Sequence, residues 1–230
     1  MKSIVKAKVL KELEKKLDYR FKDSKLLNQA ITHKSFTNEN PSGLFPDNER
    51  FEFLGDAVID LIISHLLIVS FPSSDEGGLS TLRAALVNEQ RLAYVAKSHD
   101  IGKYLLLGRG EENTGGRDKD SILSAAYEAI IGAIYLDGGF QEVFQVVRDH
   151  FSKLIDEAEE HSFRSNYKTE LQELSQALFS VTPEYVLTGE AGPDHDKSFG
   201  VDILIKGKIL GQGWGKSKKA AEQEAAREAL

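Results

Sequence analysis

Cysteine is absent from this chain of 230 residues, and that absence excludes several kinds of chemistry. Without cysteine there is no disulfide framework, no thiolate nucleophile and no zinc–thiolate site. A reducing compartment fits such a composition. Hydrophobic types make up 41% of the residues, which is enough for one large domain or for two smaller ones with separate cores.

Long hydrophobic segments are missing too. The first residues, MKSIVKAKVLKELEKKL, predict a charged helix without the apolar stretch that a signal peptide needs. The longest apolar stretch, AVIDLIISHLLIV, is interrupted by Asp60 and His65 and is too short to cross a bilayer. We therefore expect a soluble, cytoplasmic protein with no membrane partner.

Positive charge is in short supply. The chain has 29 lysines and arginines against 36 aspartates and glutamates, a net charge of −7. Proteins that bind phosphate are usually basic, so the total charge argues against a nucleic-acid partner. Any such interaction must depend on a local cluster of cations.

Two parts of the chain differ in their patterns. Apolar residues recur at helical spacing in segments separated by Gly and Pro, so residues 1–157 predict an all-α domain. The charged segment 158–165 predicts a linker. Residues 166–230 predict a small α+β domain with the order α-β-β-β-α, and the fold class is therefore multidomain. The three strands are expected at Glu184–Leu187, at 199–205 and at Lys208–Trp214.

The segment NERFEFLGDAVID carries the strongest functional pattern. Glu49, Glu52 and Asp56 are spaced i, i+3 and i+7, which places them within about 60° of one helix face. Neighbouring carboxylates on one helical turn repel by about 3 kcal/mol at an effective dielectric near 20. Either their pKa values rise or a cation binds between them. Oxygen ligands alone suit Mg²⁺ or Mn²⁺ rather than zinc.

A solvated acidic helix face is the ordinary interpretation of such a motif, but two features favour a site. Gly55 lies in the middle of the predicted helix, where it costs about 1 kcal/mol relative to alanine, so we expect a close approach to the backbone there. Glu128 lies in a second apolar helix, AAYEAIIGAIYLDGG. A carboxylate among small and apolar residues needs a partner.

These motifs carry a resemblance to a known family. NERFEFLGDAV resembles the signature of the ribonuclease III endonuclease domain, and ITHKSF at 31–36 and SILSAAYEAIIGAIYLDGG at 121–139 extend the likeness. With the C-terminal domain, the resemblance covers nearly the whole chain. It implies a hydrolase that cuts double-stranded RNA, leaves 5′-phosphate and 3′-hydroxyl ends, and serves rRNA and mRNA processing.

The resemblance also implies site residues and partners. Glu52, Asp56 and Glu128 would bind Mg²⁺, for which Mn²⁺ can substitute, with Glu49 at the margin and with Asp56 and Glu128 as the catalytic pair. No small-molecule cofactor is implied. A homodimer is implied, because each endonuclease domain cuts one strand. Its candidate contacts are Phe53, Ile59 and Ile63, for each of which core packing is an equal alternative.

One position departs from the family pattern D-x-x-E. Ala125 stands three residues before Glu128, where the family commonly has an acidic residue. Helical spacing would place that carboxylate beside Glu128, so its loss removes a group that would support the metal through another ligand or through water. The alternative function is therefore a duplex-RNA-binding protein with an impaired nuclease site.

The last domain resembles a double-stranded-RNA-binding domain, with three contact regions. Its first helix carries a polar stripe that can reach 2′-hydroxyls in a shallow minor groove, although a solvated helix face has the same pattern. His195 lies in the loop GPDHDKSF, and its assignment depends on the resemblance. Lysines crowd the start of the last helix, where they oppose the helix dipole and where bound phosphate would reverse the sign of that interaction; a lysine-rich helix start without a ligand is the alternative. The predicted RNA-binding residues are Thr169, Gln172, Glu173, Gln176, His195, Lys216, Lys218 and Lys219.

Overall fold

The structure is a computed structural model that describes residues 7–41, 46–165, 167–193 and 197–230. The chain divides into two compact units, Met1–Asp156 and Glu157–Leu230. Each unit is considered by itself below.

The first unit is helical, as the sequence predicts. Within its described residues the only bridge between extended segments is a single parallel one that joins Thr32 and Leu106. The helices are α1 (Ala7–Leu17), α2 (Ser24–Ala30), α3 (Lys34–Glu39), α4 (Glu49–Ser70), α5 (Glu76–Leu86), α6 (Glu89–Ser98), α7 (Arg109–Asn113), α8 (Asp120–Gly138) and α9 (Phe140–Ser165), with 3₁₀ turns η1 (Ile101–Tyr104) and η2 (Gly116–Asp118).

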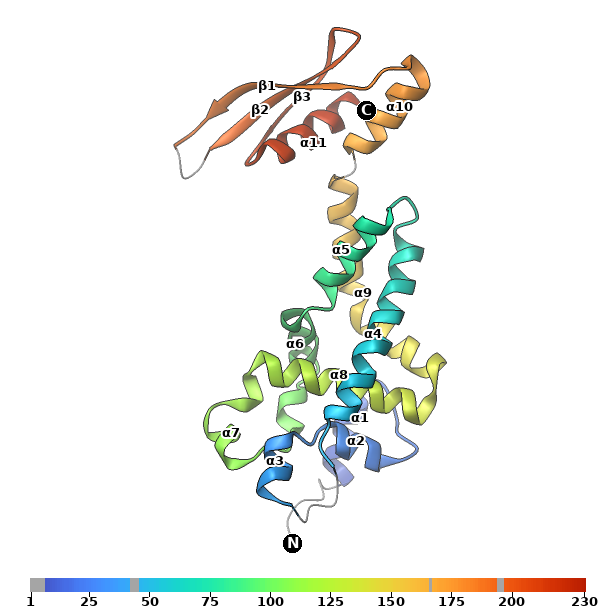
Figure 1. The fold of residues 1–230 in the computed structure, drawn as a ribbon, viewed down its shortest axis with the longest axis vertical. Helices are drawn as coiled ribbons and strands as arrows, with labels where there is room; N and C mark the ends of the chain where they lie inside the picture. Colours follow the sequence, from blue (N-terminus) through green and yellow to red (C-terminus); the bar gives the residue numbers. More distant parts are fainter. Residues whose placement is uncertain (1–6, 42–45, 166, 194–196) are drawn as a thin grey trace. The chain divides into compact units, whose positions relative to one another are not determined.

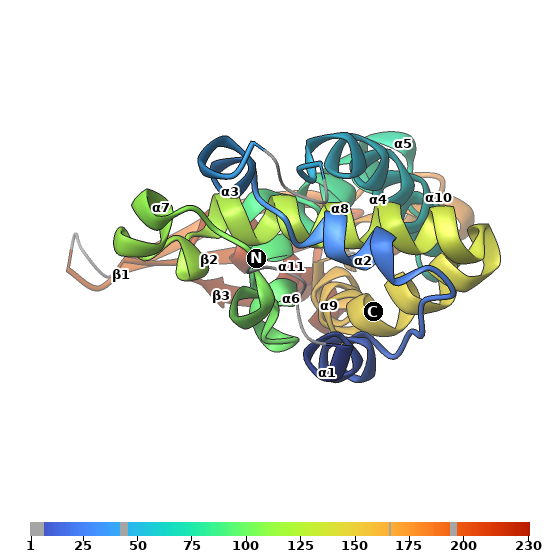
Figure 2. The same ribbon diagram turned by 90° about the horizontal axis from the view of Figure 1, so that it is seen from below.

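Helix α8 is the centre of this unit. It packs against α4, α6 and α2, and Figure 2 shows it crossing the middle of the unit. The residues from Ala129 to Ile134 are all buried, because neighbours cover the helix on every side. A helix that is apolar around its whole circumference is expected in such a position.

Helix α4 has two apolar sides. Ile59 and Ile63 are buried in the core at 1% and 0% exposure. For these two residues, core packing is therefore correct and the dimer contact is not. Phe53, Leu61 and Ile68 lie at helical spacing on another side and are 82%, 59% and 61% exposed.

Helix α4 is longer than the apolar stretch that it contains. At 22 residues, α4 is, within the described part of the chain, the one helix long and apolar enough to cross a membrane. The apolar run alone is shorter, which is why the sequence predicted no span. This is weak evidence for a span, because core helices of soluble proteins have the same length and composition.

The second unit has the predicted order of elements: α10 (Tyr167–Phe179), β1 (Glu184–Ala191), β2 (Ser198–Ile205), β3 (Lys208–Gly215) and α11 (Lys218–Ala229). The strands form one antiparallel sheet in the order β1-β2-β3. Both helices cover the same face of this sheet (Figure 1). The first strand is longer than the sequence predicts, because pairing with β2 continues to Ala191.

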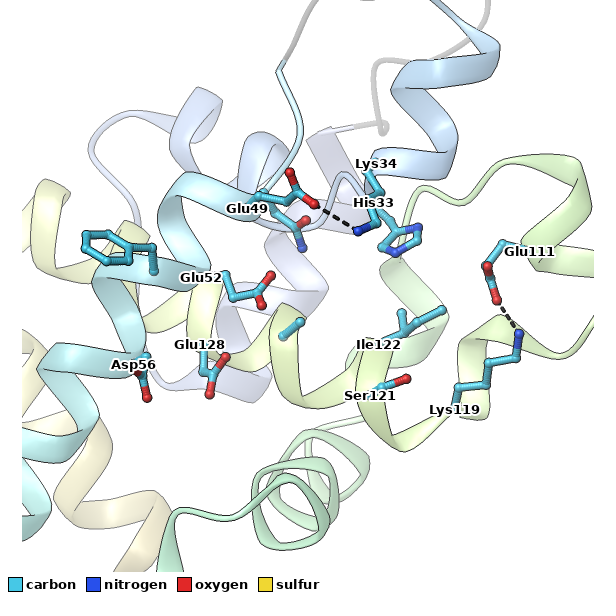
Figure 3. A pocket seen from close by; sticks show the side chains of 13 residues that line it. His33, Lys34, Glu49, Glu52, Asp56, Glu111, Lys119, Ser121, Ile122 and Glu128 are labelled. Atoms are coloured by element: carbon cyan, nitrogen blue, oxygen red, sulfur yellow. Dashed lines mark hydrogen bonds and ion pairs between the residues drawn. The ribbon is translucent and has the colours of Figure 1, made fainter. Parts of the chain in front are cut away.

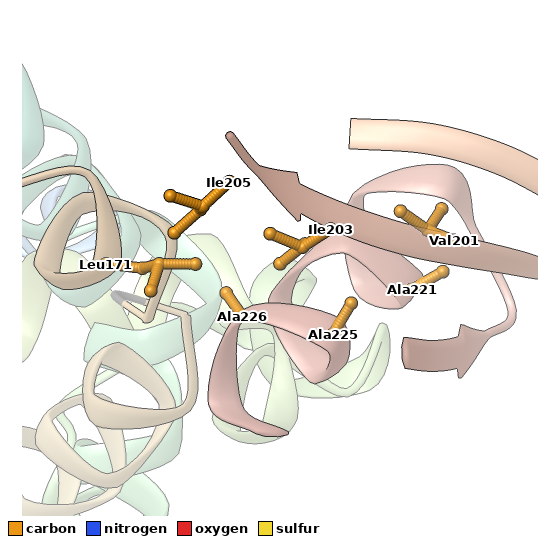
Figure 4. Close-up of a cluster of buried hydrophobic side chains, with 7 residues drawn as sticks. All are labelled: Leu171, Val201, Ile203, Ile205, Ala221, Ala225 and Ala226. Atoms are coloured by element: carbon orange, nitrogen blue, oxygen red, sulfur yellow. The ribbon is translucent and has the colours of Figure 1, made fainter. Parts of the chain in front are cut away.

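The core of this unit lies between β2 and α11 (Figure 4). Val201, Ile203 and Ile205 alternate along β2 and point to the helices, where they meet small residues of α11. A Cβ added to Gly213 would lie 2.2 Å from the backbone nitrogen of Ala225. Strand β3 can therefore approach α11 closely only with glycine at that position.

The segment 158–165 is helical, as the last part of α9. Along the chain, the boundary between the two units lies between Asp156 and Glu157, one residue before the expected domain boundary. Sparse core residues led to the expectation of a linker there, but composition does not distinguish an extended linker from a helical one.

Candidate functional site

Helices α4 and α8 cross with their backbones in contact. A Cβ added to Gly55 would lie 1.8 Å from the carbonyl oxygen of Glu128, and one added to Gly132 would lie 2.3 Å from that of Phe51. The close approach predicted at Gly55 is therefore confirmed. This crossing sets the α4 carboxylates beside the one on α8.

The start of α4 brings two carboxylates to a helix N-terminus. Asn48 is buried at the N-cap position, and its side-chain Nδ2 donates to the carbonyl of Ala30 at 3.3 Å. The backbone N–H of Glu49 donates to Asp47 Oδ1 at 3.2 Å. Glu49 and Glu52 lie in the first turn, where the helix dipole favours negative charge.

A cavity of about 680 Å³ opens where these helices cross. All four predicted metal-binding residues, Glu49, Glu52, Asp56 and Glu128, line it. Figure 3 shows the side chains of Glu52 and Asp56 on α4 beside that of Glu128 on α8. Ala125 also lines the cavity, so an acidic side chain there would enter the same space.

The carboxylates in the cavity raise one another's pKa values. Burial, followed by the charges of Asp56, Glu52 and Asp60, raises the pKa of Glu128 to about 8. Burial and the charge of Glu49 also raise the pKa of Glu52, despite the opposing effect of Lys34. Negative charge in this cavity is therefore unfavourable until a cation compensates it.

The cavity has the ligand chemistry of a hard divalent cation, but its side chains are spread. Among the described residues, no three His, Cys, Asp or Glu side chains lie close enough together to hold a metal ion as they stand. Carboxylate oxygens from α4 and α8 fit Mg²⁺ or Mn²⁺ better than any softer metal.

Two lysines in the cavity wall were not singled out by the sequence analysis. Lys34 Nζ lies 2.9 Å from Glu49 Oε1, and Lys119 pairs with Glu111. Both pairs are drawn in Figure 3. Lys34 belongs to the segment ITHKSF, but no pattern in that segment assigns it a contact with Glu49, because the two are 15 residues apart.

On α10 the predicted polar stripe is exposed to solvent. Thr169, Gln172, Glu173 and Gln176 are all exposed, and the last three line a shallow depression with Ala177. Their amide and carboxylate groups are free to meet hydroxyl and base-edge groups of a ligand.

The predicted lysine cluster surrounds the start of α11. Lys216, Lys218 and Lys219 are exposed, and Ser217 is the N-cap, its Oγ accepting from the backbone N–H of Ala220 at 3.1 Å. Lys218 Nζ lies 5.9 Å from the centre of the Phe199 ring. The remaining predicted residue, His195, lies outside the described residues.

Two family profiles match the two parts of the chain. Residues 23–155 match the profile described as Ribonuclease-III-like, and residues 167–230 match the Double-stranded RNA binding motif. The two matches together leave out only short segments of the chain.

Individual relatives agree with these profiles over nearly the full length. The Ribonuclease 3 of Syntrophobacter fumaroxidans is 49% identical over 225 residues, or 96% of this chain and 93% of that protein. The Ribonuclease 3 of Nitratiruptor sp. is 48% identical over 227 residues, or 97% and 96%. Among solved structures, the nuclease domain of Campylobacter jejuni ribonuclease III has 47% identity and a TM-score of 0.58, and covers 63% of this chain and 96% of that one. That structure is described as flexible in a region involved in dimer formation.

Proposed function

The chain belongs to the ribonuclease III family and is an endonuclease of double-stranded RNA, and from this premise we propose that Glu52, Asp56 and Glu128 hold its catalytic metal ions. The observation that carries the proposal is the half-buried Glu128, whose pKa rises to about 8 beside the carboxylates of α4. Such a perturbed group in a cavity is typical of a functional site. Glu49, paired with Lys34, contributes at the margin.

Mg²⁺ is the proposed metal, with Mn²⁺ as a substitute, because the donor atoms are all oxygen. When bound, such an ion lowers the pKa of a ligated water and neutralises charge on the phosphate. Asp56 on α4 and Glu128 on α8 would hold the ion between the two helices, and their carboxylates would accept hydrogen bonds from the attacking water. Hydrolysis by water in line with the 3′-oxygen leaves 5′-phosphate and 3′-hydroxyl ends, and requires no Ser, Cys or His nucleophile.

The second domain is proposed to bind the duplex through local contacts, which do not depend on the chain's net charge of −7. Thr169, Gln172, Glu173 and Gln176 on α10 are proposed to enter the minor groove, and Lys216, Lys218 and Lys219 to meet the phosphates. A local group of cations at a helix N-terminus binds phosphate whatever the total charge of the chain. His195 stays a predicted contact.

A homodimer is proposed through the exposed side of α4. An apolar stripe on α4 is exposed to solvent and consists of Phe53, Leu61 and Ile68. Helix α4 is thus apolar on two sides. One side packs on α8, and the other is proposed to contact a second copy of the chain. The related Campylobacter jejuni structure is described as having a region for dimer formation in its nuclease domain. Each copy would cut one strand.

The proposed role is maturation of rRNA and mRNA in the cytoplasm, where such precursors occur, without any small-molecule cofactor. The alternative of a binder with an impaired nuclease site is not favoured, because relatives named Ribonuclease 3 match the chain over nearly its full length.

Cleavage of a long RNA duplex across a titration of Mg²⁺ and Mn²⁺ tests the proposal. We expect cutting that requires metal, and we expect Glu128→Gln to abolish it while gel-shift binding in EDTA stays unchanged. Binding without cleavage at every metal concentration would contradict the catalytic role of the cavity. Unchanged cleavage by Glu128→Gln would remove that residue from the site.

A further inference from the structure

Lys119 directly precedes α8 and lines the cavity of the proposed metal site. Glu128 follows nine residues later, which corresponds to about 13 Å along a helix axis. Ile122 and Ala125, which lie between them in the sequence, line the same cavity. Figure 3 shows Lys119 and Asp56 at opposite ends of the group of lining residues. Lys119 thus lies at the far end of the cavity from the metal-site carboxylates.

Two partners fix the ammonium group of Lys119. It forms an ion pair with Glu111, whose side chain also lines the cavity, and it donates a hydrogen bond to Thr114 Oγ1 at 2.9 Å. An ammonium group has three N–H donors, and among the described residues these are its two acceptors. One donor remains for a ligand, and the Lys119 side chain is 42% exposed.

The lysines of the cavity wall serve different carboxylates. Within the described part of the chain, two lysines line the cavity; Lys34 pairs with Glu49, and Lys119 pairs with Glu111. Lys34 lies close enough to the metal-site carboxylates to lower the pKa of Glu52, whereas Lys119 does not affect it. Lys119 is therefore a cation of the cavity wall that takes no part in compensating the metal-site carboxylates.

The pair between Lys119 and Glu111 has an ordinary interpretation, which is to connect the start of α8 to α7. Ion pairs between exposed side chains contribute little to stability, however, and this one leaves a donor open to a cavity in which a polyanion reacts. An RNA strand carries a phosphate at every nucleotide. A strand with one phosphate at the metal-site carboxylates therefore brings neighbouring phosphates toward the other end of the same cavity, where they meet a cation that is already held in place.

We propose that Lys119 binds a backbone phosphate of the strand that is cut, within about two nucleotides of the scissile phosphate, and that Glu111 and Thr114 hold its ammonium group in position for this contact. The inference rests on the proposed function and adds a substrate contact made by the nuclease domain itself. Loss of one hydrogen bond between a cation and a phosphate predicts about a tenfold fall in cleavage at low RNA concentration. The salt dependence of cleavage should also become shallower, by up to about one unit of slope.

Substrates with one phosphate neutralised at a time test the proposal. A short RNA duplex that the full-length protein cuts at one position is prepared with an uncharged methylphosphonate at each phosphate flanking the cut, and cleavage is followed well below saturation. We expect one flanking position at which the wild type loses about tenfold in rate. Lys119→Gln should lose about tenfold on the unmodified duplex and nothing more at that position. Losses at every flanking position that are as large in Lys119→Gln as in the wild type would overturn the proposal.

Matched controls separate a phosphate contact from a structural role. Lys97→Gln removes a lysine that is paired with Asp120 at 2.6 Å but does not line the cavity, so this variant should cut at the wild-type rate. Lys119→Arg keeps a cation with several hydrogen-bond donors and should retain most of the rate. Binding of Mn²⁺ without RNA should be equal in Lys119→Gln and the wild type, because Lys119 does not compensate the metal-site carboxylates.

Glu111 acts in this account as a positioning residue, through Lys119. Glu111→Gln should therefore lower the rate by less than Lys119→Gln does, and it should have no effect in a chain that already carries Lys119→Gln. Wild-type rate and salt dependence in Lys119→Gln contradict the inference and leave the proposed function standing. Loss of Mn²⁺ affinity in that variant assigns the lysine to the support of the metal site and contradicts the inference too. A wild-type chain that cuts no duplex contradicts the proposed function, and the inference with it.

Discussion

At the scale of single residues, Glu128 is the most strongly perturbed carboxylate near the proposed metal site. It is half-buried in α8, and three acidic side chains act on it. A protein gains nothing in stability from such an arrangement, because the ionised form is disfavoured. Binding of a divalent cation reverses the sign of that interaction, and this reversal is the physical basis of the proposed site.

Ala125 gives a prediction at the same scale. Its side chain lines the cavity one turn before Glu128, so Ala125→Asp adds a carboxylate that reaches the ion directly or through water. We expect a lower Mg²⁺ concentration for half-maximal cleavage, by about tenfold. Ala125→Asn, of the same size but uncharged, is the control. A metal dependence identical in the three proteins would show that position 125 does not influence the site.

His150 predicts how stability depends on pH. Burial and the charge of His99, whose ring lies 3.9 Å away between centres, lower the pKa of His150 to about 4. Tyr127 Oη lies 3.1 Å from His150 Nδ1, a contact that suits a neutral ring. The unfolded chain protonates this histidine near pH 6.5. Between pH 6.5 and 4 the unfolded state therefore binds more protons than the folded state. The free energy of unfolding decreases by up to about 3 kcal/mol as the pH is lowered from 6.5 to 4.

Urea denaturation across that pH range measures the effect. His150→Phe keeps a ring in the same space but cannot be protonated, so the loss of stability on acidification should be smaller than in the wild type. If both proteins lose the same free energy of unfolding between pH 6.5 and 4, the account of His150 is wrong.

At the scale of secondary-structure elements, the crossing of α4 and α8 determines the geometry of the proposed site. Gly55→Ala adds a methyl group 1.8 Å from a backbone oxygen, and no side-chain rotation relieves that contact. The helices must move apart, at a cost of about 2 kcal/mol in the free energy of unfolding. Their carboxylates separate too, so cleavage should fall.

Gly110→Ala is the matched control for this change. A Cβ at Gly110 meets nothing within 4 Å, so the denaturant midpoint and the cleavage rate should stay at wild-type values. A Gly55→Ala protein with the stability and activity of the control would mean that backbone contact between α4 and α8 does not set the site.

The same elements show what sequence patterns can predict. Helical periodicity predicts the core helices, alternation predicts β2, and a glycine in mid-helix predicts the close approach at Gly55. Periodicity does not tell which of two apolar sides of α4 faces the core, so Phe53 could not be distinguished from Ile59. The pair between Lys34 and Glu49 depends on how α3 and α4 meet, and no local pattern carries that information.

At the scale of the whole molecule, the exposed side of α4 predicts self-association. Phe53 is 82% exposed in the single chain, and a two-fold interface uses each residue twice. Phe53→Ser should therefore weaken the dimer by about a hundredfold or more, which sedimentation equilibrium measures. Tyr94→Ser on α6, where the ring is 57% exposed, should leave the dimer intact. Equal association of both variants would place the interface elsewhere.

Equilibrium binding of Mn²⁺ without RNA, measured by electron paramagnetic resonance, tests the central claim most directly. It asks whether carboxylates of α4 and α8 together hold a divalent cation, independently of cleavage. The account predicts a site in the wild-type chain and at least a tenfold loss of affinity in both Asp56→Asn and Glu128→Gln. Wild-type affinity in Glu128→Gln would contradict it, because the ion would then be held without α8.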